Sequence, residues 1–240
     1  TYASFKRNHK MEKLLYREQN GFCCYCMRHM EVNQHISLEH VMPHNSVTKQ
    51  NKIDFKKINY YKRFNKNFKQ NVVYKHLNGT RRKWRSGPPY PHFCAYENLV
   101  LSCNGSLFID EDKEKKLYPS KMHLFFIPNI NDLIIYNKNG TIGISKIVKS
   151  SQRQIELSNT IEDLALEHER LRIIRQAWYH IATSRIYNIE EVKAAISDEP
   201  LRQNIMMDSG IPLDIVNRIK HPIYWSLLCE YFWFYKHFTP

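Results

Sequence analysis

Apolar and polar residues near the N-terminus follow a helical pattern. Leu14 and Leu15 supply apolar positions within a polar stretch from Ser4 to Asn20, which predicts a helix. Gly21 stands where a C′ residue would end that helix.

Short alternating runs after this helix predict strands. The first run covers residues 36–38 and the second covers residues 98–101. Residues 134–147 resemble a hairpin, with Asn139-Gly140 as its turn.

The last third of the chain changes to helical spacing. Thr160 and Asp163 resemble an N-cap and its box-like partner, followed by one apolar face as far as Ile186. That face consists of Ile161, Leu164, Leu171, Ile174, Trp178 and Ile181. Further helices are expected at 189–197 and 222–238, and the latter is apolar on nearly every side. Such a helix is either buried in its own chain, which we favour, or covered by a partner.

The charge of the chain points to a polyanionic partner. The 240 residues carry a formal net charge of +13, which favours nucleic acid. Thirteen basic residues and one acidic residue fall between Lys49 and Tyr90, interleaved with aromatic residues. Basic side chains neutralise phosphates and aromatic rings stack on unpaired bases, so this segment is predicted to be a phosphate-binding arm. The alternative is a solvated basic face whose aromatic residues anchor it to the core. The candidate contacts are Lys62, Arg63, Arg81, Arg82, Lys83, Trp84 and Arg85.

The hydropathy pattern also bears on localisation. No stretch of about 18 uncharged apolar residues is present, and the first residues lack an apolar signal core. We therefore expect a cytoplasmic protein without a membrane span.

The cysteines indicate a metal site rather than a disulfide framework. Cys23 and Cys26 have the C-x-x-C spacing of a zinc knuckle, although a redox pair has the same spacing. Cys103 is a candidate third ligand of structural Zn²⁺ because it follows the second predicted strand. Cys94 and His123 are candidates for the fourth.

A second group of residues suits metal-assisted hydrolysis. Glu39 immediately precedes His40 at the end of a predicted strand, and Pro43 follows. A carboxylate can hold a hard cation, and a histidine can accept a proton from water. Much later comes the run Glu97-Asn98-Leu99-Val100-Leu101-Ser102-Cys103-Asn104.

The combination of C-x-x-C, Glu-His-x-x-Pro and Asn-Leu-x-x-x-Cys resembles the HNH endonucleases. The chain is most similar to the HNH nucleases of Septu and retron-linked anti-phage systems (PtuB-like proteins), from about Gly21 to Gly140. The resemblance implies an α+β fold with a ββα-metal nuclease module over residues 1–150, which carries the basic insertion at 49–90. Residues 151–240 form a mainly helical C-terminal region in this prediction.

The resemblance also implies roles for individual residues. His40 is then the general base, Glu39 helps to bind Mg²⁺ or Mn²⁺, and Asn98 fixes the loop that carries the base. The third motif departs from the usual pattern, since Cys103 is followed by Asn104-Gly105-Ser106. Asn104 or His123 is the candidate for the remaining ligand of the catalytic ion.

The function expected from the resemblance is a bacterial anti-phage effector that cleaves nucleic acid, with DNA favoured over RNA. The expected partners are an SMC/ABC-type ATPase (PtuA-like), and a reverse transcriptase with its non-coding RNA-DNA. Two alternatives remain open at this point: an RNA- or tRNA-cleaving toxin, and a non-catalytic nucleic-acid-binding adaptor.

Overall fold

The structure is a computed structural model that describes residues 9–31, 36–40, 99–103, 106–107, 115–116 and 130–238. The chain forms two compact units, of which the first contains residues 1–37, 101–119 and 123–240. The described part of the second unit is limited to residues 38–40 and 99–100. The predicted basic arm at 49–90 lies outside the described residues.

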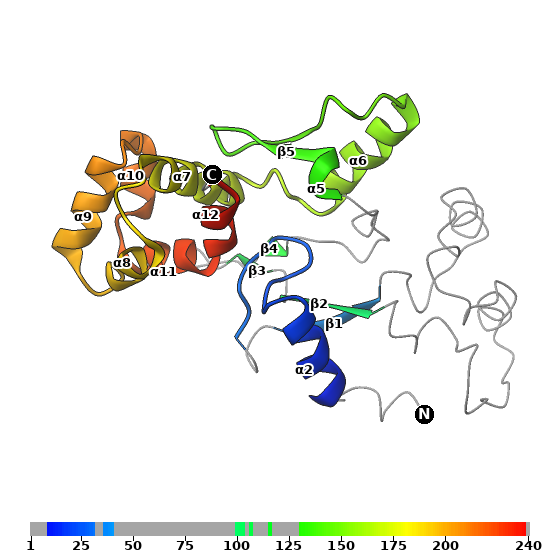
Figure 1. Cartoon of the computed structure of the whole chain (residues 1–240), viewed down its shortest axis with the longest axis horizontal. Helices are drawn as coiled ribbons and strands as arrows, with labels where there is room; N and C mark the ends of the chain where they lie inside the picture. The colour runs from blue at the N-terminus through cyan, green and yellow to red at the C-terminus, as the bar shows by residue number, and fades with distance from the viewer. Residues whose placement is uncertain are drawn as a thin grey trace, which may run out of the picture. The chain divides into compact units, whose positions relative to one another are not determined.

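Helices and short strands make up a mixed α+β fold whose C-terminal part is helical (Figure 1). The helices are α2 (His9–Glu18), α5 (Ile130–Leu133), α6 (Ser151–Asp163), α7 (Glu169–Ser184), α8 (Ile189–Ala194), α9 (Glu199–Asp208), α10 (Leu213–Ile219), α11 (Pro222–Glu230) and α12 (Phe232–Phe238). The strands are β1 (Ser37–His40), β2 (Leu99–Ser102), β3 (Ser106–Leu107), β4 (Lys115–Lys116), β5 (Ile134–Tyr136) and β6 (Ile142–Ile144). They pair as β1–β2, β3–β4 and β5–β6. The α+β class predicted from the sequence is confirmed at this level.

The predicted N-terminal helix is present as α2, although residues 4–8 lie outside the described part. The left-handed turn that ends it begins at Asn20 (φ 51°), one residue before the predicted Gly21 (φ 76°). Glycine is favoured at the second position because of its positive φ, and an added Cβ would also lie 2.8 Å from the Tyr16 hydroxyl and from His29 Nε2.

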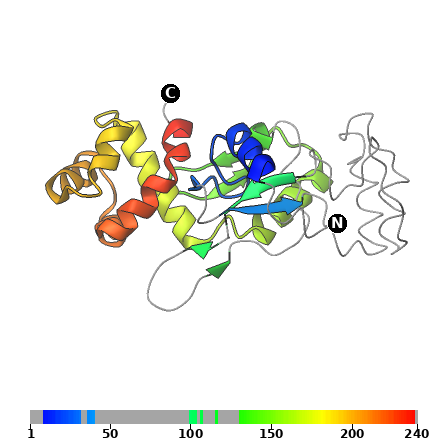
Figure 2. The same cartoon turned by 90° about the horizontal axis from the view of Figure 1, so that it is seen from below.

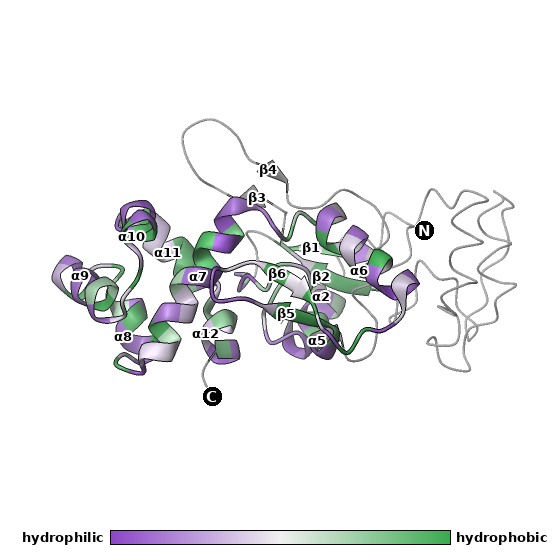
Figure 3. Ribbon diagram, turned by 90° about the horizontal axis from the view of Figure 1, so that it is seen from above, coloured by the Kyte–Doolittle hydropathy of each residue, from purple (hydrophilic) through white to green (hydrophobic). Residues whose placement is uncertain are grey.

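The strands and the hairpin lie close to their predicted positions. Residues 36–38 and 98–101 correspond to β1 and β2, each displaced by one or two residues. β5 and β6 form an antiparallel hairpin in which Ile134 pairs with Ile144. Strands β2 and β5 are coloured as hydrophobic in Figure 3, as their leucine, valine and isoleucine content requires.

Buried Arg175 fastens the hairpin to α7. Its Nε donates to the carbonyl of Gly140 at 2.6 Å, and its Nη2 donates to the carbonyl of Leu166 at 2.8 Å. Gly140 has φ +77°, and a Cβ there would lie 2.0 Å from the carbonyl oxygen of Arg172. The turn predicted at Asn139-Gly140 is therefore also a point of close packing against α7.

The helical region differs from the prediction at Thr160. Thr160 is not an N-cap: it lies buried inside α6, whose N-cap is Ser150. The predicted continuous face is divided between α6 and α7 by a turn in which Ala165 has φ 51°. Leu164 and Leu166 are buried within that turn, so the apolar spacing continues although the helix does not.

The segment 222–238 is also two helices, α11 and α12, separated at Tyr231. Its predicted burial within the chain is confirmed, because Trp225, Leu228, Tyr231 and Phe234 are all buried. α12, which is red in Figure 2, packs against α7. Helices α9 and α10 were not predicted from the sequence.

Two buried tryptophans join the C-terminal helices. The Trp178 indole donates to the Leu228 carbonyl at 2.9 Å, and the Trp225 indole donates to the Val192 carbonyl at 2.8 Å. Both side chains therefore bury large apolar surfaces while their N–H groups stay hydrogen-bonded.

Within the described ranges, no helix is long and apolar enough to cross a membrane.

Candidate metal centre

The C-x-x-C sequence folds into a tight loop. A β-bridge joins Phe22 to His29, and the Cys23 N–H donates to the Arg28 carbonyl at 2.8 Å. The Met27 N–H donates back to the Cys23 carbonyl at 3.1 Å, and Met27 has φ 64°. This left-handed residue reverses the chain directly after Cys26, so both cysteines face the same side of the turn.

Strand β2 is fixed to this loop by backbone groups at Leu101. The Gln19 side-chain amide makes two hydrogen bonds of 2.8 Å with Leu101, one to its carbonyl and one from its N–H. The Cys24 N–H donates to the same carbonyl at 3.2 Å. Cys103 follows two residues later and is thereby placed beside Cys23 and Cys26.

The three thiols form a compact donor set. The Sγ atoms of Cys23, Cys26 and Cys103 lie within 4.8 Å of one another, and those of Cys26 and Cys103 are 3.7 Å apart. A tetrahedral zinc ion with Zn–S bonds of ~2.3 Å requires S···S separations of about 3.8 Å. A disulfide would need ~2.05 Å. Thiolate is the ligand that zinc prefers, so these residues fit a zinc ion, and the predicted trio is confirmed as a cluster that could hold a metal.

Burial controls the protonation of this cluster. The relative exposures of Cys23, Cys26 and Cys103 are 0%, 3% and 1%. Burial, and after it the hydrogen bonds and charges of the two neighbouring thiols, raise the pKa of Cys26 well above its ordinary value. The thiol of Cys26 is therefore protonated at neutral pH unless a cation displaces the proton.

Donors near the sulfur atoms favour negative charge on the cluster. The Tyr25 N–H donates to Cys23 Sγ at 3.4 Å, and the Tyr231 hydroxyl lies 4.0 Å from Cys26 Sγ. Burial raises the pKa of Tyr231 well above its usual range, which keeps this hydroxyl protonated as a donor. N–H and O–H groups around ligand sulfur atoms typically orient the ligands and moderate their charge.

Glu230, at the end of α11, contacts the loop that carries Cys23 and Cys26. Arg28 forms a hydrogen-bonded ion pair with Glu230, and the His29 N–H donates to the Glu230 carbonyl at 2.6 Å. Burial acts to lower the pKa of Arg28, but the charge and hydrogen bond of Glu230, together with Tyr231 and Cys103, outweigh it, so the pKa lies above its ordinary value. Sequence reasoning missed Arg28, Glu230 and Tyr231. No local pattern links residues about 200 positions apart. The sequence signals near them were the C-x-x-C motif that ends at Cys26 and the apolar segment 222–238.

Of the predicted catalytic residues, Glu39 and His40 lie within the described part of the chain, and Asn98 lies outside it. Glu39 and His40 end strand β1, which pairs with β2, and the Glu39 side chain is half-buried. Several predicted site residues lie outside the described part of the chain: Asn98, Asn104, His123, Lys62, Arg63, Arg81, Arg82, Lys83, Trp84 and Arg85. Their roles stay predictions.

Comparison with known proteins adds no family assignment. No protein-family model, no curated protein and no solved structure matches this chain. The function therefore has to be argued from the residues and from the cysteine cluster.

Proposed function

We propose that this chain is a metal-dependent HNH endonuclease that hydrolyses phosphodiester bonds in DNA as the effector of a Septu- or retron-type anti-phage system. The observation that carries the proposal is the assembly of Cys23 and Cys26 with Cys103, which is 77 residues further along the chain than Cys26. The HNH resemblance requires its C-x-x-C and Asn-Leu-x-x-x-Cys motifs to belong to one module. The cysteine cluster supports that requirement.

Strands β1 and β2 add a second line of support. β1 ends in Glu39-His40, and its partner β2 runs from Leu99, next to Asn98, to the residue before Cys103. In the proposed mechanism His40 accepts a proton from the attacking water, while Glu39 helps to hold Mg²⁺ or Mn²⁺. Asn98 orients the loop that carries the base, and Asn104 or His123 completes the site of the catalytic ion.

The divalent ion would stabilise the negative charge that develops on the scissile phosphate and on the leaving oxygen. Zinc at the cysteines would have a structural role, because a fourth ligand from Cys94 or His123 would leave no open position for water or substrate. The two proposed ions therefore differ in both ligand chemistry and function.

The catalytic assignment is tested by comparing His40→Ala with His44→Ala, a matched histidine four positions further on. Purified protein, together with the proposed PtuA-like ATPase, is incubated with plasmid DNA and with total RNA in Mg²⁺ or Mn²⁺. We expect His40→Ala to remove cleavage while folding and nucleic-acid binding stay nearly intact, and His44→Ala to keep cleavage. Glu39→Ala should weaken the metal dependence as well as the rate. A well-folded His40→Ala protein with ordinary activity contradicts the assignment.

The same incubation separates the alternatives. Cleavage of RNA but not of plasmid would favour the RNA- or tRNA-cleaving toxin. Binding without cleavage of either substrate would favour the adaptor, which the departure from the third motif at Cys103-Asn104-Gly105-Ser106 makes the second candidate.

The basic arm is proposed to bind the phosphates of the substrate. Reversing the charges of Arg81, Arg82, Lys83 and Arg85 to Glu should weaken binding regardless of sequence. Each lost phosphate contact should also remove roughly 0.7 to 0.9 from the slope of log K against log salt concentration. Trp84→Ala should cost more affinity for single strands than for duplexes, because a ring stacks on unpaired bases.

An arm that instead docks the ATPase gives a different result. The quadruple variant would then fail to co-purify with the ATPase, while its affinity for nucleic acid and its salt slope stayed unchanged. Partnership with the ATPase, or with a reverse transcriptase and its RNA-DNA, is proposed on the resemblance alone.

A further inference from the structure

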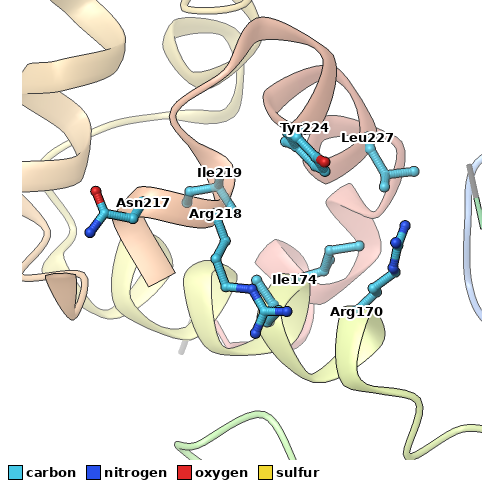
Figure 4. Close-up of a pocket in the computed structure, with 8 residues that line it drawn as sticks. Arg170, Ile174, Asn217, Arg218, Ile219, Tyr224 and Leu227 are labelled. Carbon is cyan, nitrogen blue, oxygen red and sulfur yellow. The ribbon is translucent and has the colours of Figure 1, made fainter. Parts of the chain in front are cut away.

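A pocket of about 240 Å³ lies between α7, α10 and α11, away from the cysteine cluster in sequence (Figure 4). Its lining residues are Arg170, Ile173, Ile174, Asn217, Arg218, Ile219, Tyr224 and Leu227. The nuclease proposal uses none of them. The inference below stands independently of that proposal.

The walls of this pocket combine a buried apolar surface with polar side chains that are less buried. Ile174, Ile219 and Leu227 are buried, so the apolar wall is part of the helical core. The Tyr224 side chain is half-buried, and one edge contact of its ring is with His221, at 6.3 Å between ring centroids. An apolar surface next to an accessible aromatic ring suits a flat heterocycle or another planar apolar body.

Two arginines supply positive charge from different helices. The Arg218 side chain extends from α10 towards α7, and the Arg170 side chain extends from the start of α7 towards α11, whereas Asn217 points away from both (Figure 4). Arg218 Nη1 also donates to Glu169 Oε1 at 2.7 Å, in a pair whose side chains are both well exposed. Exposed pairs of this kind contribute little free energy, so a ligand anion can compete for Arg218.

We propose that this pocket binds a nucleoside monophosphate unit, with the phosphate on the arginines and the base against Tyr224 and the apolar wall. A phosphate monoester carries up to two negative charges and several acceptor oxygens, which suits a site with two guanidinium groups.

The size of the pocket restricts the ligand to one nucleotide. Pockets for drug-sized ligands measure roughly 300–1,000 Å³, and the volume of about 240 Å³ lies below that range. Two sources have the required chemistry: a free nucleotide and the phosphorylated end of a nucleic-acid strand.

The test is calorimetric titration of the full chain with AMP, GMP, CMP and UMP, compared with adenosine and with inorganic phosphate. Arg170→Gln and Arg218→Gln should each weaken nucleotide binding by about tenfold or more, since each removes a charge-assisted contact. The matched control is Arg172→Gln, because Arg172 is an exposed arginine of the same helix that does not line the pocket. Melting curves of the three variants establish that each one is folded.

Hexanucleotides with and without a 5′-phosphate distinguish the two sources. Tighter binding of the phosphorylated hexamer, lost in Arg170→Gln and Arg218→Gln, identifies a strand end, whereas preference for the mononucleotide identifies a free nucleotide. The proposal is overturned if no nucleotide binds, if inorganic phosphate binds as tightly as AMP, or if Arg172→Gln weakens binding as much as the two pocket variants do.

Discussion

Removal of a cysteine from the metal cluster should reveal how much a bound ion stabilises the chain. The decisive variant is Cys103→Ala, because Cys103 comes from a different segment from the C-x-x-C pair and its side chain is 1% exposed. A ligand at about 1,000 times its dissociation constant adds about 4 kcal/mol to the free energy of unfolding. In a chain of this size, 1 kcal/mol shifts Tm by roughly 2–4 °C. Saturating zinc should therefore raise the Tm of the metal-free protein by about 8–16 °C.

The comparison needs a cysteine of the same loop outside the trio. Cys24 is half-buried beside it, so Cys24→Ala should keep the zinc-dependent rise in Tm while Cys103→Ala loses most of it. Elemental analysis should find about one zinc per chain in the wild type and in Cys24→Ala. The reasoning is refuted if a chelator leaves the Tm of the wild type unchanged, or if the two alanine variants respond to zinc alike.

Three further results are expected from the helical region. Gly140→Ala should lower the free energy of unfolding by about 3 kcal/mol or more, measured by urea denaturation, because a Cβ would lie 2.0 Å from the Arg172 carbonyl oxygen. Arg202→Met should lower the free energy of unfolding by about 3 kcal/mol in the same measurement, since buried Arg202 donates to the carbonyls of Ala195, Ile196 and Lys220. A loss below about 1 kcal/mol would show that these hydrogen bonds matter little. Burial lowers the pKa values of His180 and His237, so the unfolded state binds more protons and the free energy of unfolding should fall as pH drops below about 6.5. The double variant with Asn at both positions should flatten this dependence between pH 5.5 and 7, and an equally steep curve would contradict it.

Sequence patterns located the elements whose signals are local. The Asn139-Gly140 turn, strands β1 and β2 and helix α8 each depend on residues within a few positions of one another, and each was found within one to three residues. The boundary between α6 and α7 was missed because Ala165, with φ 51°, gives no sequence signal for a left-handed turn. Buried Leu164 and Leu166 on either side preserved the apolar spacing of a single helix.

Part of the candidate site was also predictable from local sequence. The spacing of Cys23 and Cys26 indicated a tight loop, and Cys103 was singled out because it follows a strand. The partners that hold this arrangement were not predictable, since the ion pair of Arg28 with Glu230 and the approach of Tyr231 join opposite ends of the chain. Long-range pairs of this kind depend on the packing of α11 and α12, which no short motif encodes.

The chemistry of the two proposed metal sites explains why one chain would need both. Buried thiolates select a soft or borderline ion such as zinc, and a fourth protein ligand, proposed to be Cys94 or His123, would close its coordination. The carboxylate of Glu39 and the proposed nitrogen and oxygen ligands instead favour a hard ion such as Mg²⁺ or Mn²⁺, which keeps water and can activate it. An ion that stabilises the fold must remain bound through each catalytic cycle, whereas a catalytic ion must exchange ligands with the substrate. Separate sites with different ligand types meet both requirements, and so Cys103→Ala should act on stability and His40→Ala on cleavage.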